Sequence, residues 1–331
     1  MKALEFQGIG RLGLVEVPVP RPGPGQLLVR TGAAVICTSD VNELRTGIFG
    51  ASLPIIFGHE GAGTVAEVGP DVRGFDVGDR VATHPVHSCH DCENCRAGME
   101  HLCARMRHFG LNMPGTFAEY YIVGAERARK APATVPFEPL ALAEPISVCL
   151  QALAQARANE RSRLLILGDG PFGILISILA RSMKVGRIVA AGSHDFRLRF
   201  ADADETVNIR KGGELKGPFE AIILAVGNAA AVQQGLALLR PKGRLVIFSA
   251  VNDPTPIDLL SVHIRELEIV GACNDQDLLD EAVRRLSDNP ATFARIITHR
   301  FLLERYSEAF DMAANHHNSA LKVAFTFDSR P

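Results

Sequence analysis

The chain has 331 residues, with 35 Lys and Arg against 37 Asp and Glu, so its formal net charge is −2. This balance provides no general electrostatic attraction to nucleic acid or to an anionic membrane. Hydrophobic residues at 47% and charged residues at 22% are typical of a globular protein, which excludes a disordered chain, and the length predicts about two domains.

No apolar run is expected to reach the roughly 20 residues that a membrane span needs. The most apolar stretch, Ile174–Ala180, is short, and the first residues lack the apolar region of a signal peptide. These features favour a cytoplasmic protein.

The chain from residue 1 to about residue 144 is predicted to consist of short strands and turns. Alternating prolines between residues 18 and 24 exclude a helix there. Segments rich in Val and bounded by Gly predict strands, and they are Gln26–Ile36, Gly61–Gly69, Val77–Thr83 and Phe117–Val123. This pattern indicates a β-barrel-like unit with a cysteine-rich lobe inserted in it.

Four of the seven cysteines, Cys89, Cys92, Cys95 and Cys103, lie within fifteen residues. Thiolates three positions apart can converge on one cation from a tight turn, and a fourth closes a tetrahedron, as in a structural zinc site. Four unligated thiols on a surface loop are the alternative, which is disfavoured because exposed thiols oxidise. The odd number of cysteines argues against a disulfide framework.

From about Ser147 to Cys273 apolar strands alternate with helices, which predicts a parallel sheet covered on both faces. The predicted strands are Arg163–Gly168, Arg187–Ala191, Ala221–Gly227, Arg244–Ser249, Leu267–Gly271 and, more weakly, Glu205–Ile209. The predicted helices include Phe172–Met183 and Ala229–Leu239. After Cys273 we expect a helix over Leu278–Leu286 and a strand over Ala320–Phe327.

A glycine-rich turn predicts where a dinucleotide binds. It follows the strand Arg163–Gly168 and opens a helix, and its residues are Gly168, Gly170, Pro171, Phe172 and Gly173. Such glycines allow a tight turn and close approach of the backbone to a pyrophosphate, which the helix N-terminus attracts.

The end of the next strand favours NADP over NAD. An NAD site usually carries Asp or Glu there for the ribose 2′-hydroxyl. Here Gly192 leaves room, Ser193 can donate a hydrogen bond, and His194 and Arg197 can offset phosphate charge. Asp195 weakens this prediction. Val226, near the end of the predicted strand Ala221–Gly227, is also predicted to contact the cofactor.

Three further residues have ordinary structural interpretations when each is taken alone. Cys37 follows a strand, His59 lies in Gly58-His59-Glu60, and Glu144 precedes Pro145. They could be a buried thiol, a hydrogen-bonded imidazole and a carboxylate at a helix start.

Together with Gly78-Asp79-Arg80, the cysteine lobe, Phe117-Ala-Glu119-Tyr120 and the glycine-rich turn, these motifs occur in one order along nearly the whole chain. The chain resembles the zinc-dependent medium-chain dehydrogenase/reductase family, and the Glu-Pro motif makes it most similar to the sorbitol (polyol) and threonine dehydrogenase branch. The resemblance implies a two-domain α/β protein: a GroES-like catalytic domain (1–146 and 276–331, with a zinc lobe at 86–104) and a Rossmann domain (147–275).

The resemblance also implies two zinc ions per chain. Cys37, His59 and Glu144 would hold the catalytic zinc, Glu60 would lie beside it, and the four lobe cysteines would hold the structural one. Three protein ligands leave one position for a substrate oxygen. Ser39 matches the hydroxyl that passes the alcohol proton. Asn42 replaces the His that ends the proton relay in many relatives, and neither His101 nor His108 is assigned that role.

The predicted reaction is hydride transfer between NAD(P) and a secondary alcohol or ketone, with a polyol, cyclitol or amino alcohol as substrate. The alternatives are a zinc-independent quinone or enoyl reductase of the same superfamily and a non-enzymatic cofactor-binding protein. A zinc ribbon for nucleic acid would need a basic, aromatic-rich face, whereas aromatic residues are only 6%. We expect a homodimer or homotetramer, with Leu267–Gly271 as the candidate edge strand, and neither a nucleic-acid nor a membrane partner.

Overall fold

The computed structural model describes residues 1–315 and 319–327, and its chain separates into two compact units. The first comprises Met1–Pro145 and Leu279–Pro331, and the second comprises Ile146–Leu278. The predicted domain bounds, 1–146 with 276–331 and 147–275, run close to this division, although 316–318 and 328–331 lie outside the described residues.

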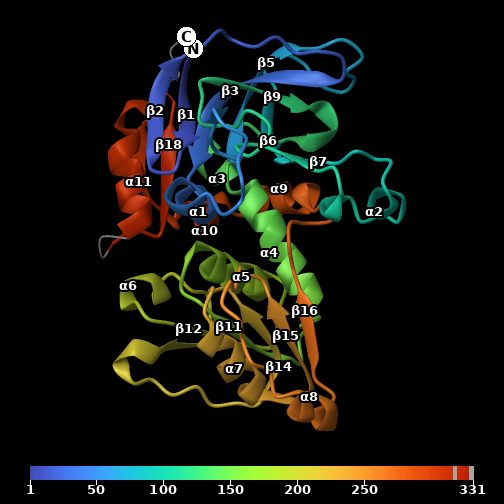
Figure 1. The fold of residues 1–331 in the computed structure, drawn as a ribbon, viewed down its shortest axis with the longest axis vertical. Helices are drawn as coiled ribbons and strands as arrows, with labels where there is room; N and C mark the ends of the chain where they lie inside the picture. Colours follow the sequence, from blue (N-terminus) through green and yellow to red (C-terminus); the bar gives the residue numbers. More distant parts are fainter. Residues whose placement is uncertain (316–318, 328–331) are drawn as a thin grey trace. The chain divides into compact units, whose positions relative to one another are not determined.

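The first unit is built mainly of antiparallel strands (Figure 1). Its largest sheet has the order β10-β6-β5-β3-β18-β17, with β9 also paired to β3. The strands of this sheet are β3 Gln26–Val35, β5 Glu60–Val68, β6 Arg80–Thr83, β9 Tyr120–Gly124, β10 Ala128–Lys130, β17 Ile297–Leu302 and β18 Lys322–Thr326. The smaller sheets contain β1 Lys2–Gly8, β2 Arg11–Glu16 and β4 Ile55–Ile56, and β7 Val86–His87 with β8 Arg107–His108.

Close approach of β3 and β5 depends on glycine. A Cβ added to Gly63 would lie 2.1 Å from the carbonyl oxygen of Arg30, so no side chain fits between the two strands at this position. The antiparallel register pairs Val35 with Glu60 and thereby places the end of β3 beside the start of β5.

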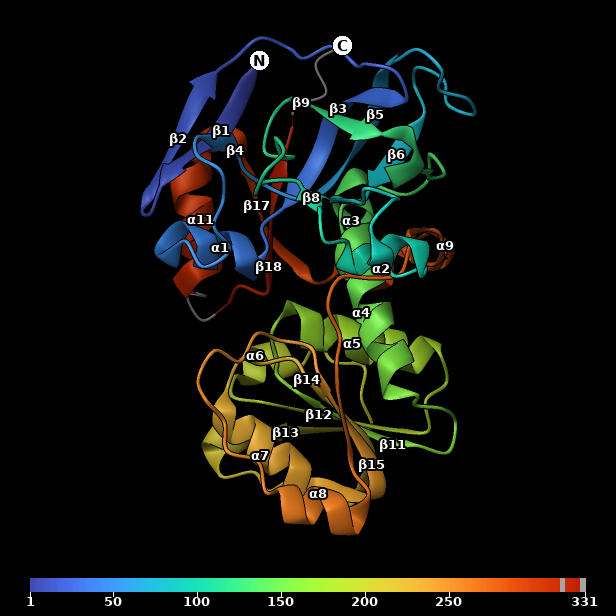
Figure 2. The ribbon, with the colours of Figure 1, turned by 45° about the vertical axis from the view of Figure 1, so that its right-hand side comes forward.

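The end of the chain returns to the first unit. Strand β18 pairs antiparallel with β3, so that Ala324 faces Val35, and Figure 2 shows β18 and helix α11 (Tyr306–Asn315) among the N-terminal strands. The ring of Phe325 packs against that of Phe117 with a centroid distance of 5.1 Å in a buried aromatic cluster. The other helices here are α1 Thr38–Thr46, α2 Glu93–Arg96, α3 Phe137–Leu140, α9 Leu279–Asp288 and α10 Pro290–Ala294.

The second unit is a six-stranded parallel sheet with the order β13-β12-β11-β14-β15-β16. Counted along the chain this order is 3-2-1-4-5-6, which is the doubly wound dinucleotide-binding topology. Its strands are β11 Arg163–Leu167, β12 Arg187–Gly192, β13 Glu205–Asn208, β14 Phe219–Leu224, β15 Leu239–Ile247 and β16 Glu268–Gly271. Its helices are α5 Pro171–Ser182, α6 Asp195–Leu198, α7 Ala229–Leu238 and α8 Leu259–Arg265. The predicted two-domain α/β fold class is therefore confirmed.

The expectation that no apolar run is long enough to cross a membrane is wrong as stated. The helical stretch Phe137–Ala156 includes α3 and α4 (Ala143–Ala156). By its length and composition it is long and apolar enough to cross a membrane. Of the qualifying window, 83% is buried inside the protein, as in the core helix of a folded domain. The sequence pattern missed it because Glu138 and Glu144 interrupt the apolar run.

Candidate functional site

Cys37, His59 and Glu60 form a buried group of metal-ligating side chains. Cys37 lies between β3 and α1, and His59 and Glu60 lie at the start of β5, next to β3. One ligand atom from each residue lies within 4.8 Å of the others, and the three residues are 4%, 8% and 0% exposed. A thiol, an imidazole and a carboxylate at this spacing match the donor set that zinc accepts in proteins.

Asp40 orients this group through both of its carboxylate oxygens. His59 Nδ1 donates to Asp40 Oδ1 at 3.0 Å, and the backbone N–H of Cys37 donates to Asp40 Oδ2 at 2.9 Å. This arrangement leaves His59 Nε2 to face a metal. Burial by itself lowers the pKa of His59, but the negative charge and hydrogen bond of Asp40 outweigh it and raise that pKa well above its ordinary value. No sequence motif assigned a role to Asp40.

We expect Asp40→Asn to weaken zinc binding at this group by about 10- to 100-fold, because the imidazole loses its charged orienting partner. Competition with a zinc chelator, followed by metal analysis of the recovered protein, measures the change. Asp76→Asn, at an exposed turn of the same unit, serves as the control. Unchanged zinc affinity in Asp40→Asn would contradict this role.

Lys322 is a buried residue that sequence reasoning missed. Its Nζ lies 2.9 Å from Glu60 Oε1 and 2.6 Å from Oε2, and the two residues are 2% and 0% exposed. Burial lowers the pKa of Lys322, but Glu60, then Cys37 and more weakly Glu144 raise it, and the net shift is upward. Because β18 runs beside β3, a residue 262 positions from Glu60 neutralises that carboxylate.

Glu144 is placed less directly than the sequence predicted. It lies in the first turn of α4 and is 8% exposed. Its negative charge contributes to the raised pKa of Lys322, so Glu144 borders the same buried region. The group with ligand atoms within 4.8 Å contains Glu60 as its carboxylate instead of Glu144.

The remaining predicted residues of the first unit differ in their closeness to this group. Ser39 Oγ lies 3.5 Å from His59 Nε2, as a hydroxyl beside a metal ligand would. His108 lies with its ring centroid 5.3 Å from that of His59, and burial lowers the pKa of His108 to about 3, which keeps it neutral. Asn42 lies exposed on α1, and His101 is buried in the cysteine lobe.

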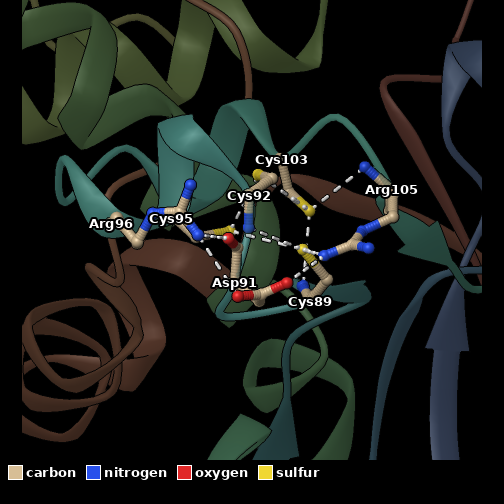
Figure 3. A network of polar contacts seen from close by, with 7 residues as sticks. All are labelled: Cys89, Asp91, Cys92, Cys95, Arg96, Cys103 and Arg105. Atoms are coloured by element: carbon tan, nitrogen blue, oxygen red, sulfur yellow. Dashed lines mark hydrogen bonds and ion pairs between the residues drawn. The ribbon is translucent and has the colours of Figure 1, made fainter.

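The four lobe cysteines converge as the sequence spacing predicts (Figure 3). Their sulfurs lie 3.4 Å apart for Cys92–Cys95 and 3.9 Å apart for both Cys89–Cys95 and Cys92–Cys103. Zinc–sulfur bonds of about 2.3 Å in a tetrahedron give sulfur–sulfur edges of about 3.8 Å. The lobe therefore has the dimensions of a four-thiolate zinc site.

Charged groups and backbone amides around the lobe favour thiolates. Arg105 donates to Cys89 Sγ at 3.4 Å and pairs with Asp91 at 2.9 Å. A hydrogen bond from the Asp91 backbone, followed by that of Arg105, lowers the pKa of Cys89 to about 5. Local desolvation and the neighbouring sulfurs raise the pKa of Cys95 to about 12, so this thiol would lose its proton only when a cation binds in the lobe.

The glycine-rich turn in the second unit follows β11, as predicted. A Cβ on Gly168 would lie 2.4 Å from the Ala225 carbonyl oxygen, and one on Gly173 would lie 1.9 Å from the carbonyl oxygen of Gly168, so both positions require glycine. Gly170 is the N-cap of α5 and Pro171 its first residue, so the N-terminal end of this helix, which favours an anion, lies at the turn.

The predicted cofactor residues gather at the carboxyl ends of three neighbouring strands. The glycine-rich turn follows β11, Ser193 and His194 follow β12, and Val226, which is 37% exposed, follows β14. Ligands of doubly wound sheets bind at this edge, where the strand order reverses. The structure also places here a carboxylate that the β12 sequence lacks, from Asp169 of the glycine-rich turn, whose Oδ2 accepts from the backbone N–H of Ser193 at 2.7 Å.

A thiol, imidazole and carboxylate group in a β-rich unit, a four-cysteine lobe and a doubly wound nucleotide unit define a zinc-dependent, nicotinamide-dependent dehydrogenase. Residues 23–133 match the family described as alcohol dehydrogenase GroES-like domain, and residues 171–288 match zinc-binding dehydrogenase.

Individual proteins agree with this class. The chain is 30% identical to a sorbitol dehydrogenase of Bombyx mori, over 97% of both chains. It is 31% identical to an L-threonine 3-dehydrogenase of Deinococcus deserti, over 94% of this chain and 95% of that one. A putative zinc-binding dehydrogenase of Sinorhizobium meliloti bound to NADP superposes with a TM-score of 0.93 at 28% identity, over 98% of this chain and 99% of that one.

The chain thus belongs to the zinc-dependent medium-chain dehydrogenase/reductase family. It is an NAD(P)-dependent alcohol oxidoreductase, as the sequence motifs predicted.

Proposed function

We propose that this enzyme interconverts a polyhydroxylated or amino-substituted secondary alcohol and its ketone, with zinc held by Cys37, His59 and Glu144. The observation that carries the proposal is the buried group of Cys37, His59 and Glu60, whose ligand atoms lie within 4.8 Å of one another, together with the charge of Glu144 acting on Lys322 beside that group. Glu60, ion-paired to Lys322, is the neighbouring carboxylate that can replace Glu144 or a solvent ligand.

The chain's own residues have distinct parts in this reaction. Zinc in this group supplies Lewis acidity toward the substrate oxygen, and a bound nicotinamide supplies the hydride acceptor or donor. Asp40 holds His59 in the orientation that presents Nε2. Ser39 Oγ, 3.5 Å from that nitrogen, is placed to take the proton of a substrate hydroxyl. Lys322 balances the charge of Glu60, so the buried site carries one negative charge less than it would without this lysine.

The substrate class rests on the carboxylate ligand and on the relatives. A Glu in the ligand set is a feature of the polyol branch that this sequence resembles, and the chain's relatives include proteins named sorbitol and L-threonine dehydrogenase. A polar substrate with neighbouring hydroxyl or amino groups is consistent with both.

The test is absorbance at the reduced-nicotinamide band during incubation of the zinc-loaded enzyme with a panel of polyols, cyclitols, amino alcohols and simple secondary alcohols. Each substrate is tested with NAD and with NADP. The proposal predicts turnover of at least one polyhydroxylated or amino alcohol above that of 2-butanol. Turnover confined to simple alcohols, or turnover that survives complete removal of zinc, would overturn it.

We propose two zinc ions per chain, one at the Cys37 group and one at the lobe, and a preference for NADP over NAD. The NADP preference is supported by the half-buried Ser193 and the exposed His194 after β12 and by the absence of a carboxylate on residues 192–194. We also propose that the protein is cytoplasmic.

A homo-oligomer is proposed from the second unit. Strand β16 is the edge of its sheet, and the neighbouring helix α8 exposes Leu259, Leu260 and Ile264 at 72%, 65% and 69%. Exposed apolar residues of this size beside an open sheet edge are typical of a subunit interface. Two copies can pair there to form a dimer, or a dimer within a tetramer.

We expect Leu260→Glu combined with Ile264→Glu to convert the oligomer into monomers, because two buried charges would be introduced into the interface. Light scattering after size exclusion measures the mass. Ile209→Glu, a change at another exposed apolar residue of the same unit, is the control that keeps the oligomer. An unchanged mass in the double variant would rule out this surface as the interface.

A further inference from the structure

Asp169 lies where the ends of two strands meet in the second unit. It occupies the glycine-rich turn between Gly168 and Gly170, directly after β11, and β12 is the parallel neighbour of β11. Its side chain lies against Gly192 at the end of β12, where an added Cβ would come within 2.3 Å of Asp169 Cβ. Gly192 is therefore the residue that admits this carboxylate.

The carboxylate of Asp169 binds the turn that follows β12. Its Oδ2 accepts from the backbone N–H groups of Ser193 at 2.7 Å and His194 at 2.6 Å, and from His194 Nδ1 at 3.2 Å. Its Oδ1 lies 3.8 Å from a terminal nitrogen of Arg197. Asp169 is 7% exposed and Arg197 is 8% exposed, so the pair is shielded from solvent.

These contacts change the electrostatics of the predicted NADP site. Three residues could receive a 2′-phosphate: Ser193, His194 and Arg197. All three lie beside the carboxylate of Asp169, a negative charge that the β12 sequence does not carry. A 2′-phosphate adds negative charge at this edge, whereas the ribose hydroxyl of NAD is neutral. The charge of Arg197 is already balanced by Asp169 and cannot act fully on a phosphate.

We propose that Asp169 is a coenzyme-discriminating residue that limits the preference for NADP over NAD and keeps NAD usable. The proposal rests on the proposed function of this unit as the nicotinamide cofactor site. In NAD sites a carboxylate at the end of the second strand supplies negative charge beside the ribose. Asp169 supplies such a charge at the end of β12, but from the turn after β11.

Asp195, the other carboxylate of this region, does not have this effect. Its side chain pairs with Lys211 and accepts from Asn208, and it is 56% exposed, so its charge is balanced and screened by water. It offers a matched control, since it lies two residues before Arg197 and carries the same charge.

The test measures dissociation constants of NADPH and NADH by fluorescence titration of the zinc-loaded wild type, Asp169→Asn and Asp195→Asn. Asn at 169 can still accept from the Ser193 and His194 amides, so the turn is retained while the charge is removed. We expect the ratio of NADH to NADPH dissociation constants to rise about tenfold in Asp169→Asn, comparable to the removal of one nearby like charge. In Asp195→Asn it is expected to change less than about twofold, because that charge is exposed and screened.

Arg197→Gln completes the test. In the wild type we expect it to change the NADH to NADPH ratio only slightly, whereas in Asp169→Asn it should reverse most of the gain, because Arg197 then acts on the phosphate. If Asp169→Asn does not fold, Asp169→Ala is titrated and the same direction is expected. An unchanged ratio, or equal weakening of both coenzymes, would overturn the proposal in favour of a purely structural role. Absence of binding of either coenzyme to the wild type would instead contradict the proposed function.

Discussion

Cys37→Ser is expected to lower kcat/KM for the preferred alcohol by about three orders of magnitude or more. The serine oxygen is a poorer zinc ligand than the thiolate, and the loss of Lewis acidity removes several kcal/mol of transition-state stabilisation. Because Cys37 belongs to one of two ligand groups, zinc content should fall from two ions to one per chain. Steady-state kinetics and metal analysis of the same preparation measure both effects.

The control for this variant is Cys273→Ser, which changes an exposed thiol of the second unit. It should retain both zinc ions and wild-type turnover. Coenzyme binding should also survive in Cys37→Ser, since the nucleotide residues belong to the other unit. Full activity of Cys37→Ser with only the lobe zinc present would remove the catalytic-metal assignment.

Cys92→Ser is expected to remove the lobe zinc and to lower the melting temperature by about 10 °C. Structural zinc sites contribute directly to folding stability, and a loss of a few kcal/mol shifts the melting temperature of a domain of this size by that amount. Within the lobe, Cys92 Sγ lies near two other sulfurs, so its loss opens the tetrahedron (Figure 3). Differential scanning calorimetry measures the shift.

The two cysteine variants are expected to separate two roles. Cys92→Ser should make the segment from residue 89 to 103 more sensitive to proteolysis, whereas Cys37→Ser should leave that sensitivity unchanged. Both variants should lose one zinc ion. If Cys92→Ser kept two zinc ions and the wild-type melting temperature, the lobe would not be a structural metal site.

The sequence predicted most of the second unit because its elements are defined locally. Strands such as β11 and β14 end in apolar runs, Leu-Leu-Ile-Leu and Ala-Ile-Ile-Leu, and the glycine-rich turn follows directly after β11. The boundaries differ by a few residues. At the start of β15, for example, Leu239 pairs with Phe219 of β14, and the strand continues through Pro241 and Gly243, residues that are typical of a turn.

The strands β1 and β2 were not predicted. The hairpin has the alternation of a half-buried pair, but its apolar residues are separated by Glu, Gln and Gly, and the pattern is weak in the sequence alone. Its stability comes from packing of Leu4 and Phe6 into a core that includes Phe325 from the end of the chain.

The amino-acid sequence by itself determined the cysteine lobe, the glycine-rich turn and the division of the chain into a strand-and-turn part and a part where strands alternate with helices. Each of these features depends on residues a few positions apart. Tertiary structure decided which carboxylates and cations meet. Pairing of β3 with both β5 and β18 brings Lys322 to Glu60, and parallel pairing of β11 with β12 brings Asp169 to Arg197. Spacing along the chain carries no information about such contacts, since strand register and sheet order set them only when the whole sheet has formed.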